Sequence, residues 1–234
     1  MTDGGAILEA RGVTKVYETR GVETRALNGV DLAIGEGEFT ALSGPSGSGK
    51  TTLLNLFGAL DEPTGGEVRL DGEDLAGLGA AALSELRLRK LGFVFQAYNL
   101  IPVLSAVENI EFVMVLQGVA AAERRARAGA LLREVELEGL GGKRPLEMSG
   151  GQQQRVAVAR AIASRPRIVL ADEPTANLDS ETASRLLDLM ERLNREQGVT
   201  FLFSTHDPLV MERARRNVRL KDGRVVADET KTAA

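Results

Sequence analysis

The sequence contains no cysteine, no tryptophan and only one histidine. Without cysteine the chain can form no disulfide and perform no thiolate chemistry, which fits a reducing compartment such as the cytoplasm. The chain also has no large excess of either charge, because 29 basic and 33 acidic residues give a net charge of −4. We therefore expect no nucleic acid partner on the basis of charge.

Long apolar runs are missing as well. No run approaches the ~18 residues that a membrane helix requires. The N-terminal segment "MTDGGAILEARGV" lacks the basic and then apolar pattern of a signal peptide. Hydrophobic residues still make up 43% of the chain, which is enough to build a core. We expect a soluble chain that acts at a membrane only through a partner.

Four short apolar runs each end in polar residues. They are "FTALSG", "GFVFQ", "RIVLADE" and "TFLFSTHD". Runs that are apolar on both faces are typical of central strands in a parallel sheet covered by helices, and helical stretches such as "TTLLNLFGAL" and "SETASRLLDLMERLNREQG" alternate with them. In such sheets ligands bind beyond the carboxyl ends of the strands, so we expect these polar residues to gather at one edge.

The two ends of the chain predict antiparallel strands. Residues 7–39 alternate apolar and polar residues with glycine turns, and "NVRLKDGRVVAD" contains an Asp-Gly hairpin signal. From Ala97 to about Pro166 the pattern becomes helical, starting with a capping box of Ser105 and Glu108. We expect residues 1–96 and 167–234 to form an α/β core with antiparallel strands at both ends, and 97–166 to be an inserted helical subdomain.

"GPSGSGKT" is a glycine-rich phosphate-binding loop between a predicted strand and a predicted helix. Backbone N–H groups and the helix N-terminus would surround the phosphates. Lys50 would reach the β- and γ-phosphates, and Thr51 would hold Mg²⁺. The predicted contacts are Gly44, Pro45, Ser46, Gly47, Ser48, Gly49, Lys50, Thr51 and Thr52. By itself the motif suits a small-molecule kinase, a GTPase or a motor equally.

Two carboxylates narrow the choice. Asp172, at the end of a buried strand, would bind Mg²⁺, and the adjacent Glu173 would polarise the attacking water. A carboxylate directly after the magnesium aspartate favours a hydrolase over a kinase. The chain has no guanine-reading N-K-x-D pattern, which favours adenine. We therefore predict hydrolysis of ATP with Mg²⁺.

Three further residues are candidates. His206, the single histidine, ends another predicted strand at the same edge and would contact the γ-phosphate or the attacking water. Gln96 would offer a neutral amide oxygen to Mg²⁺ or water. Tyr17 would either stack on an adenine ring or fill a β layer, and the residues alone leave both open.

A second glycine-rich segment, "MSGGQQQR", follows in the helical region. Ser149 and the N–H groups of Gly150 and Gly151 would present another anion site at a helix start. Since the first loop already surrounds the phosphates from one side, this segment would close on a nucleotide held by another copy in a two-fold homodimer. The alternative is an ordinary serine-glycine helix start with solvent-exposed glutamines.

Together these segments resemble the ATP-binding subunits of ABC transporters, in family order and over nearly the whole chain. The resemblance implies Walker A at "GPSGSGKT", the Q-loop at Gln96, and Walker B with the catalytic base at "IVLADE". It also implies a switch histidine at His206 and an aromatic A-loop residue at Tyr17. The signature is "MSGGQ", which adds Gln152 to the nucleotide contacts, and the D-loop "ANLD" adds Asp179. The fold it implies is a P-loop NTPase core with a mostly parallel sheet, an N-terminal antiparallel β subdomain and an inserted helical subdomain.

Within the family the chain looks most like the lipoprotein-releasing and macrolide-exporter branch, the LolD and MacB type. That branch implies a cytoplasmic ATPase on the inner face of the cell membrane, whose ATP-driven closure moves a separate permease with a large extracytoplasmic domain. The loop of residues 97–104 and the helical lobe would be its docking surface. One alternative is an FtsE-like regulator that signals through a permease-like partner without transporting a substrate. Another, a soluble ABC ATPase acting on DNA or ribosomes, is disfavoured because no heptad run or repeat is present.

Overall fold

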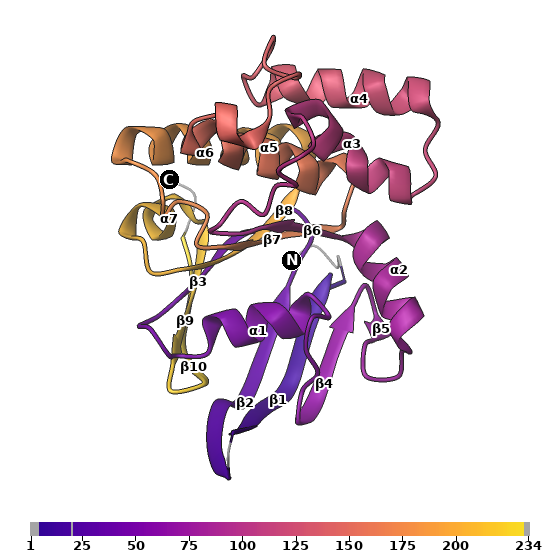
Figure 1. Ribbon diagram of the computed structural model, residues 1–234. Helices are drawn as coiled ribbons and strands as arrows, with labels where there is room; N and C mark the ends of the chain where they lie inside the picture. The colour runs from indigo at the N-terminus through magenta and orange to yellow at the C-terminus, as the bar shows by residue number, and fades with distance from the viewer. Residues whose placement is uncertain (1–4, 20, 232–234) are drawn as a thin grey trace.

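The computed structural model describes residues 5–19 and 21–231, arranged as two β-sheets with helices above, below and between them (Figure 1). The elements in chain order are β1 (Leu8–Thr19), β2 (Val22–Ile34), β3 (Phe39–Ser43), α1 (Lys50–Phe57), β4 (Gly65–Leu70), β5 (Glu73–Asp74), α2 (Ala80–Lys90), β6 (Leu91–Val94), α3 (Ala106–Leu116), α4 (Ala121–Glu134), a 3₁₀ turn (Pro145–Glu147), α5 (Gly150–Ala163), β7 (Ile168–Asp172), α6 (Ser180–Gln197), β8 (Thr200–Thr205), α7 (Pro208–Arg213), β9 (Arg216–Lys221) and β10 (Arg224–Thr230). None of the helices in these residues has the length and hydrophobicity that spanning a bilayer requires.

The larger sheet has six strands in the order β10-β9-β3-β8-β7-β6. The four predicted apolar runs form β3, β8, β7 and β6, and these strands pair in parallel. The predicted hairpin is also confirmed, because β10 pairs antiparallel with β9 across a turn in which Asp222 and Gly223 both have positive φ. Parallel pairing places the carboxyl ends of β3, β6, β7 and β8 along one edge.

The smaller sheet is antiparallel, in the order β2-β1-β4-β5. This confirms the predicted N-terminal β subdomain. Its strands β4 and β5, and the helix α2, were not expected from the sequence. The sequence gives little signal for β5 and α2, because β5 has only two residues and α2 buries only Leu86. Neither element therefore shows a clear periodic pattern of hydrophobic residues.

The six-stranded sheet divides the core in two, because alternate residues of a strand face opposite sides. Phe39, Phe201 and Phe203 face the cluster that includes α3, α4, α5 and α6. Their neighbours Leu42 and Leu202 face the second cluster, with α1 and the antiparallel sheet. In Figure 1 α3, α4, α5 and α6 lie above the sheet, and α1 lies below it against the smaller sheet. Burial of both faces explains why these strands are apolar throughout.

Helix boundaries follow the expected signals. α3 begins at the capping box of Ser105 and Glu108. α6 ends at Gly198, which takes the left-handed conformation with a φ of 69°. Its residues Leu186, Leu189, Met190 and Leu193 form the buried face. Ordinary capping and packing therefore determine where α3 and α6 begin or end and which face of α6 is buried.

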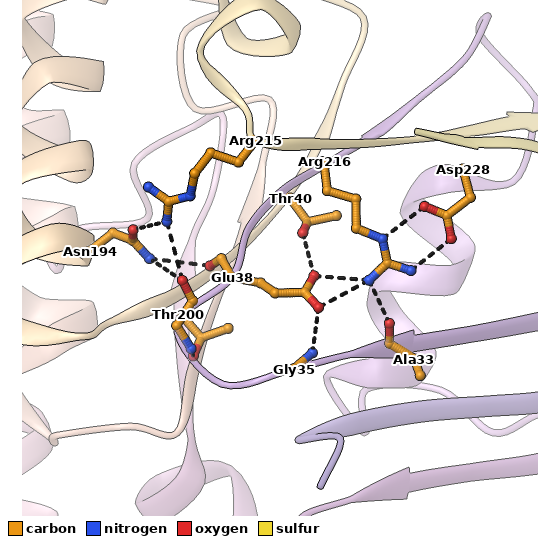
Figure 2. A network of polar contacts seen from close by, with 10 residues as sticks. Ala33, Gly35, Glu38, Thr40, Asn194, Thr200, Arg215, Arg216 and Asp228 are labelled. Carbon is orange, nitrogen blue, oxygen red and sulfur yellow. Dashed lines mark hydrogen bonds and ion pairs between the residues drawn. The ribbon is translucent and has the colours of Figure 1, made fainter. Parts of the chain in front are cut away.

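A polar network stabilises the opposite end of the sheet, where β3 begins (Figure 2). Arg216 of β9 donates to both oxygens of Glu38, at 2.9 and 3.1 Å, and to both oxygens of Asp228, at 2.7 and 2.8 Å. Next to it, Arg215 donates to the side chain of Asn194 on α6. These bonds tie the β2–β3 turn to β9, β10 and α6. Because the charges are paired within the chain, we assign this network a structural role.

Candidate nucleotide site

The glycine-rich loop connects β3 to α1, as expected, and the packing around it explains its glycines. Gly44 has a φ of 149°, and a Cβ there would collide with the main-chain oxygen of Leu220. Gly49 has a φ of 102°, and a Cβ would lie 2.6 Å from the oxygen of Ala26. The loop is thus packed against β9 and β2. Only glycine fits both positions, because each combines a positive φ with contact to backbone.

Lys50 begins α1 and bends back over the loop. It is only 8% exposed. Its Nζ donates to the carbonyl oxygens of Gly44 at 2.8 Å and Pro45 at 3.0 Å. This holds the ammonium above the loop, where phosphate oxygens would compete with these carbonyls for it. The hydroxyl of Ser48, in the same loop, is buried and has no hydrogen-bond partner among the described residues.

One pocket of about 590 Å³ brings most of the predicted residues together. Its lining is Thr24, Arg25, Ala26, Pro45, Ser46, Gly47, Gly49, Lys50, Thr51, Thr52, Gln96, Glu173 and His206. The loop, Gln96, Glu173 and His206 follow β3, β6, β7 and β8, so the predicted gathering at one sheet edge is what the structure has. Thr24, Arg25 and Ala26 were missed by sequence reasoning. Nothing in a solvent-exposed stretch of β2 indicates that it borders a pocket.

Of the predicted magnesium ligands, Thr51 and Gln96 line this pocket, and Asp172 adjoins Thr51. Thr51 Oγ1 is 3.4 Å from Asp172 Oδ1, and Gln96 lines the same pocket. Burial raises the pKa of the Asp172 carboxyl above its ordinary value, and the charge of Glu173 adds to the rise. A hydroxyl, a carboxylate and an amide are oxygen donors, which is the donor set that Mg²⁺ prefers when substrate phosphates complete its shell. The residues present therefore fit this ion.

Glu173 and His206 contact each other. The Nδ1 of His206 lies 2.6 Å from Oε1 of Glu173, while Thr205 Oγ1 donates to Oε2 at 3.0 Å. Glu173 also has a φ of 45°, in the left-handed region that non-glycine residues rarely adopt. Its N–H is fixed by a 2.9 Å bond to the oxygen of Ser204. The neighbouring strand thus holds a strained backbone and aims the carboxylate, an arrangement that is common at functional sites.

The second glycine-rich segment begins α5, as predicted, and it lies outside this pocket. Ser149 and Gln152 form a reciprocal capping box, with bonds of 3.3 and 3.0 Å. A Cβ on Gly150 would lie 2.7 Å from the hydroxyl of Tyr98, and one on Gly151 would collide with the methyl of Thr182. Capping and close packing within one chain are therefore enough to explain why serine, glycine and glutamine occupy these positions.

Of the three consecutive glutamines in this segment, Gln154 is the buried one. Gln154 is fully inaccessible, and its Nε2 donates to the oxygen of Pro174 at 2.8 Å and that of Phe95 at 3.4 Å. It thereby joins the start of α5 to the backbone just before Gln96 and just after Glu173. The alternative interpretation of this segment, a helix start with solvent-exposed glutamines, does not hold for Gln154, although a polar side chain in a helix usually lies on such a face.

The two remaining predicted residues, Asp179 and Tyr17, do not line the pocket. Asp179 is the N-cap of α6 and accepts hydrogen bonds from the main chain and hydroxyl of Thr182. Tyr17 does not line the pocket itself, but it pairs in the β1–β2 ladder with Thr24, which does. The Tyr17 side chain is 37% exposed, and its hydroxyl donates to Asp61 at 2.8 Å.

Comparisons with known proteins agree with this geometry. The sequence pattern of the family described as ABC transporter matches residues 27–176. The lipoprotein-releasing system ATP-binding protein LolD of Anaeromyxobacter dehalogenans is 52% identical, over 94% of this chain and 93% of its own length. The macrolide export ATP-binding/permease protein MacB 1/2 of Paracoccus denitrificans is 47% identical over 96% of this chain, which spans 34% of that longer protein.

Solved structures give the same result. The ATP-binding cassette MJ0796, in a dimeric post-hydrolysis state bound to ADP and Pi, is 44% identical, with a TM-score of 0.89 over 97% of this chain and 100% of that one. The predicted fold is confirmed by this match. The chain has two sheets and a glycine-rich loop at the edge of the parallel strands. A carboxylate and a histidine face this loop. These features and the similarity to known ATP-binding cassettes agree with each other. We conclude that the chain belongs to the ABC transporter family and is one of its ATP-hydrolysing cassettes.

Proposed function

We propose that this ATPase works as a two-fold dimer with two composite sites, each made of the phosphate loop of one copy and the signature segment of the other. The main support for the proposal is that the signature segment at the start of α5 lies outside the nucleotide pocket of its own chain. The pocket gathers the loop, Gln96, Glu173 and His206, but Ser149 and the glycines after it are not part of its lining. A helix N-terminus with two glycines outside the pocket is available to the nucleotide of a second copy.

Within each site the roles follow from position. The loop N–H groups and Lys50 bind the phosphates of ATP, with Lys50 exchanging its two carbonyl partners for phosphate oxygens. Thr51, Asp172 and Gln96 would hold Mg²⁺, which neutralises phosphate charge when bound. Glu173 accepts a proton from the water that attacks the γ-phosphate, and ADP leaves with the broken bond's electron pair. His206 holds the Glu173 carboxylate and faces the same phosphate.

Nucleotide then controls the dimer. ATP contacts both copies, so binding favours the closed dimer, and hydrolysis removes the γ-phosphate that the signature segment contacts. The dimeric structures of MJ0796, one of them bound to ADP and Pi, support this cycle by similarity. In this cycle we propose that residues 97–166 act as the helical subdomain, since α3, α4 and α5 lie within that range and pack in one cluster.

The partner we propose is an integral membrane permease of the LolD and MacB type, which would keep the cassette at the inner face of the cell membrane. A groove of about 520 Å³ runs between the core and the helical lobe, and is lined by Leu60, Ile101, Phe112 and Leu116 among others. Three of these large apolar side chains are 40–58% exposed. Such a surface favours an apolar segment of a partner. Closure of the dimer would then pull on the permease and perform work in its extracytoplasmic domain.

The dependence of activity on enzyme concentration tests the composite site. Specific ATPase activity of the purified chain in detergent-free solution should fall on dilution, because dissociated copies lack the second half of each site. Below the dimer dissociation constant, a tenfold dilution should lower specific activity by up to about tenfold. Specific activity that stays constant down to concentrations where the chain sediments as a monomer would contradict the proposal.

A further inference from the structure

The hydroxyl of Tyr17 is held by a residue far away in the sequence. It donates to Oδ2 of Asp61 at 2.8 Å. The other oxygen, Oδ1, accepts from Nζ of Lys15 at 2.6 Å and from the N–H of Glu62 at 2.8 Å. Lys15 also donates to the main-chain oxygen of Glu62 at 2.7 Å. The Asp61 carboxylate thus ties β1 to the loop that follows α1.

Lys15 restrains the same ring a second time. Lys15 and Tyr17 are two residues apart on β1, so their side chains share a face of the strand. The Lys15 Nζ lies 4.9 Å from the centroid of the Tyr17 ring, within the range of a cation–π contact. The Lys15 and Asp61 side chains are only 12% and 29% exposed. The tyrosine is therefore held at its hydroxyl by Asp61 and over its ring by a largely buried ammonium.

The clamp of Lys15, Asp61 and Tyr17 adjoins the nucleotide pocket. Tyr17 pairs in the β1–β2 ladder with Thr24, which lines the pocket. Asp61 follows the end of α1, and α1 begins at Lys50 of the phosphate loop. The same short helix therefore connects the phosphate end of the site with the residue that holds Tyr17.

We propose that Asp61, braced by Lys15, is a positioning residue for adenine recognition. It orders the Tyr17 ring before nucleotide arrives, so that stacking costs less conformational entropy on binding. Asp61 does not touch the nucleotide and acts through Tyr17. This inference rests on the proposed function and adds to it that Tyr17 stacks on the base of ATP, as the resemblance to the family implies.

The ionisation states agree with this geometry. Burial raises the pKa of the Tyr17 phenol, and the hydrogen bond to Asp61 raises it further. Burial also raises the pKa of the Asp61 carboxyl, but the hydrogen bonds from Lys15, Tyr17 and Glu62 outweigh it and leave that pKa below its ordinary value. At neutral pH the carboxylate is therefore charged and accepts the phenol proton as a hydrogen bond.

The test compares two ligands of the same loop, Mg·ATP and magnesium with inorganic triphosphate, which has no base. Binding of each to the full chain is measured by calorimetry. Tyr17→Ala should weaken ATP by about tenfold through lost stacking. Asp61→Ala and Tyr17→Phe should each weaken ATP binding by about fivefold. The double variant should bind ATP no more weakly than either single variant, because both substitutions remove the same hydrogen bond between Tyr17 and Asp61. Affinity for triphosphate should stay within twofold throughout.

Controls separate positioning from folding. Glu62→Ala removes the adjacent carboxylate, whose side chain takes part in none of the hydrogen bonds of the described residues, and should leave both affinities unchanged. If Asp61→Ala unfolds the chain, Asp61→Asn serves instead, since it keeps the volume and loses the charge that Lys15 pairs with. Equal losses of ATP and triphosphate affinity in the folded Asp61 variants would overturn the inference.

Two outcomes distinguish this inference from the proposed function. If Tyr17→Ala weakens ATP but Asp61→Ala and Asp61→Asn do not, the inference is wrong and the stacking role of Tyr17 stands. If Tyr17→Ala leaves ATP affinity unchanged, or triphosphate fails to bind the parent chain, the assigned nucleotide contacts are wrong and the inference falls with them.

Discussion

Glu173→Gln should lower ATP turnover by about 10²–10⁴-fold, the usual contribution of a general base, and should leave a stable ATP-bound dimer. The substitution keeps the shape of the side chain that accepts from Thr205 and contacts His206. It removes the group that accepts the proton of the attacking water. Binding, and with it closure of the dimer, would continue without the hydrolysis that reopens it.

Light scattering with and without Mg·ATP, together with phosphate release, measures both effects of Glu173→Gln. Glu138→Gln is a matched control, because it removes one negative charge from an exposed position in the helical region. It should hydrolyse ATP at the parent rate and show no long-lived dimer. If Glu173→Gln stays monomeric at saturating ATP, closure does not depend on nucleotide bound between two copies.

Lys50→Ala should reduce turnover by about 10²–10³-fold. The estimate is by analogy with other preorganised donors, whose loss costs about 3–4 kcal/mol of transition-state stabilisation. The Lys50 ammonium is buried and fixed above the loop by two carbonyl oxygens, so its charge acts on phosphate in a weakly screened position. Removing it leaves the loop without its only side-chain cation.

Steady-state ATPase assays over a wide ATP range measure this loss for Lys50→Ala. Lys143→Ala, which removes an exposed ammonium from the loop before the signature segment, should keep parent activity. Thermal unfolding of both variants should be close to that of the parent chain. Parent-level turnover by Lys50→Ala would show that the glycine-rich loop is not the phosphate site.

Much of the fold follows from simple sequence signals. The runs that became β3, β6, β7 and β8 were apolar on both faces because helices and a second sheet cover them. Asp222-Gly223 specified a hairpin through its positive φ angles, and Gly198 ended α6 in the same way. These features are local, so neighbouring residues alone reveal them.

Part of the lining of the candidate pocket was predictable from sequence, and its geometry was not. Strand ends brought Lys50, Gln96, Glu173 and His206 to one pocket, since the carboxyl ends of parallel strands share an edge. The left-handed backbone of Glu173 was not predictable, because it depends on a bond to a neighbouring strand. Asp61 and Gln154 were missed for the same reason: each acts through partners that are close only in the folded chain.

A mixing experiment tests the composite site most directly. Lys50→Ala abolishes the phosphate loop of its own copy, and Ser149→Glu places a negative charge where the signature segment would approach the γ-phosphate. Each variant alone should keep no more than about 1% of parent activity. In an equal mixture half of the dimers are mixed, and each of these has one intact site out of two, so we expect about a quarter of parent activity. Mixtures no more active than their parts, or full activity of Ser149→Glu alone, would contradict a site shared between two copies.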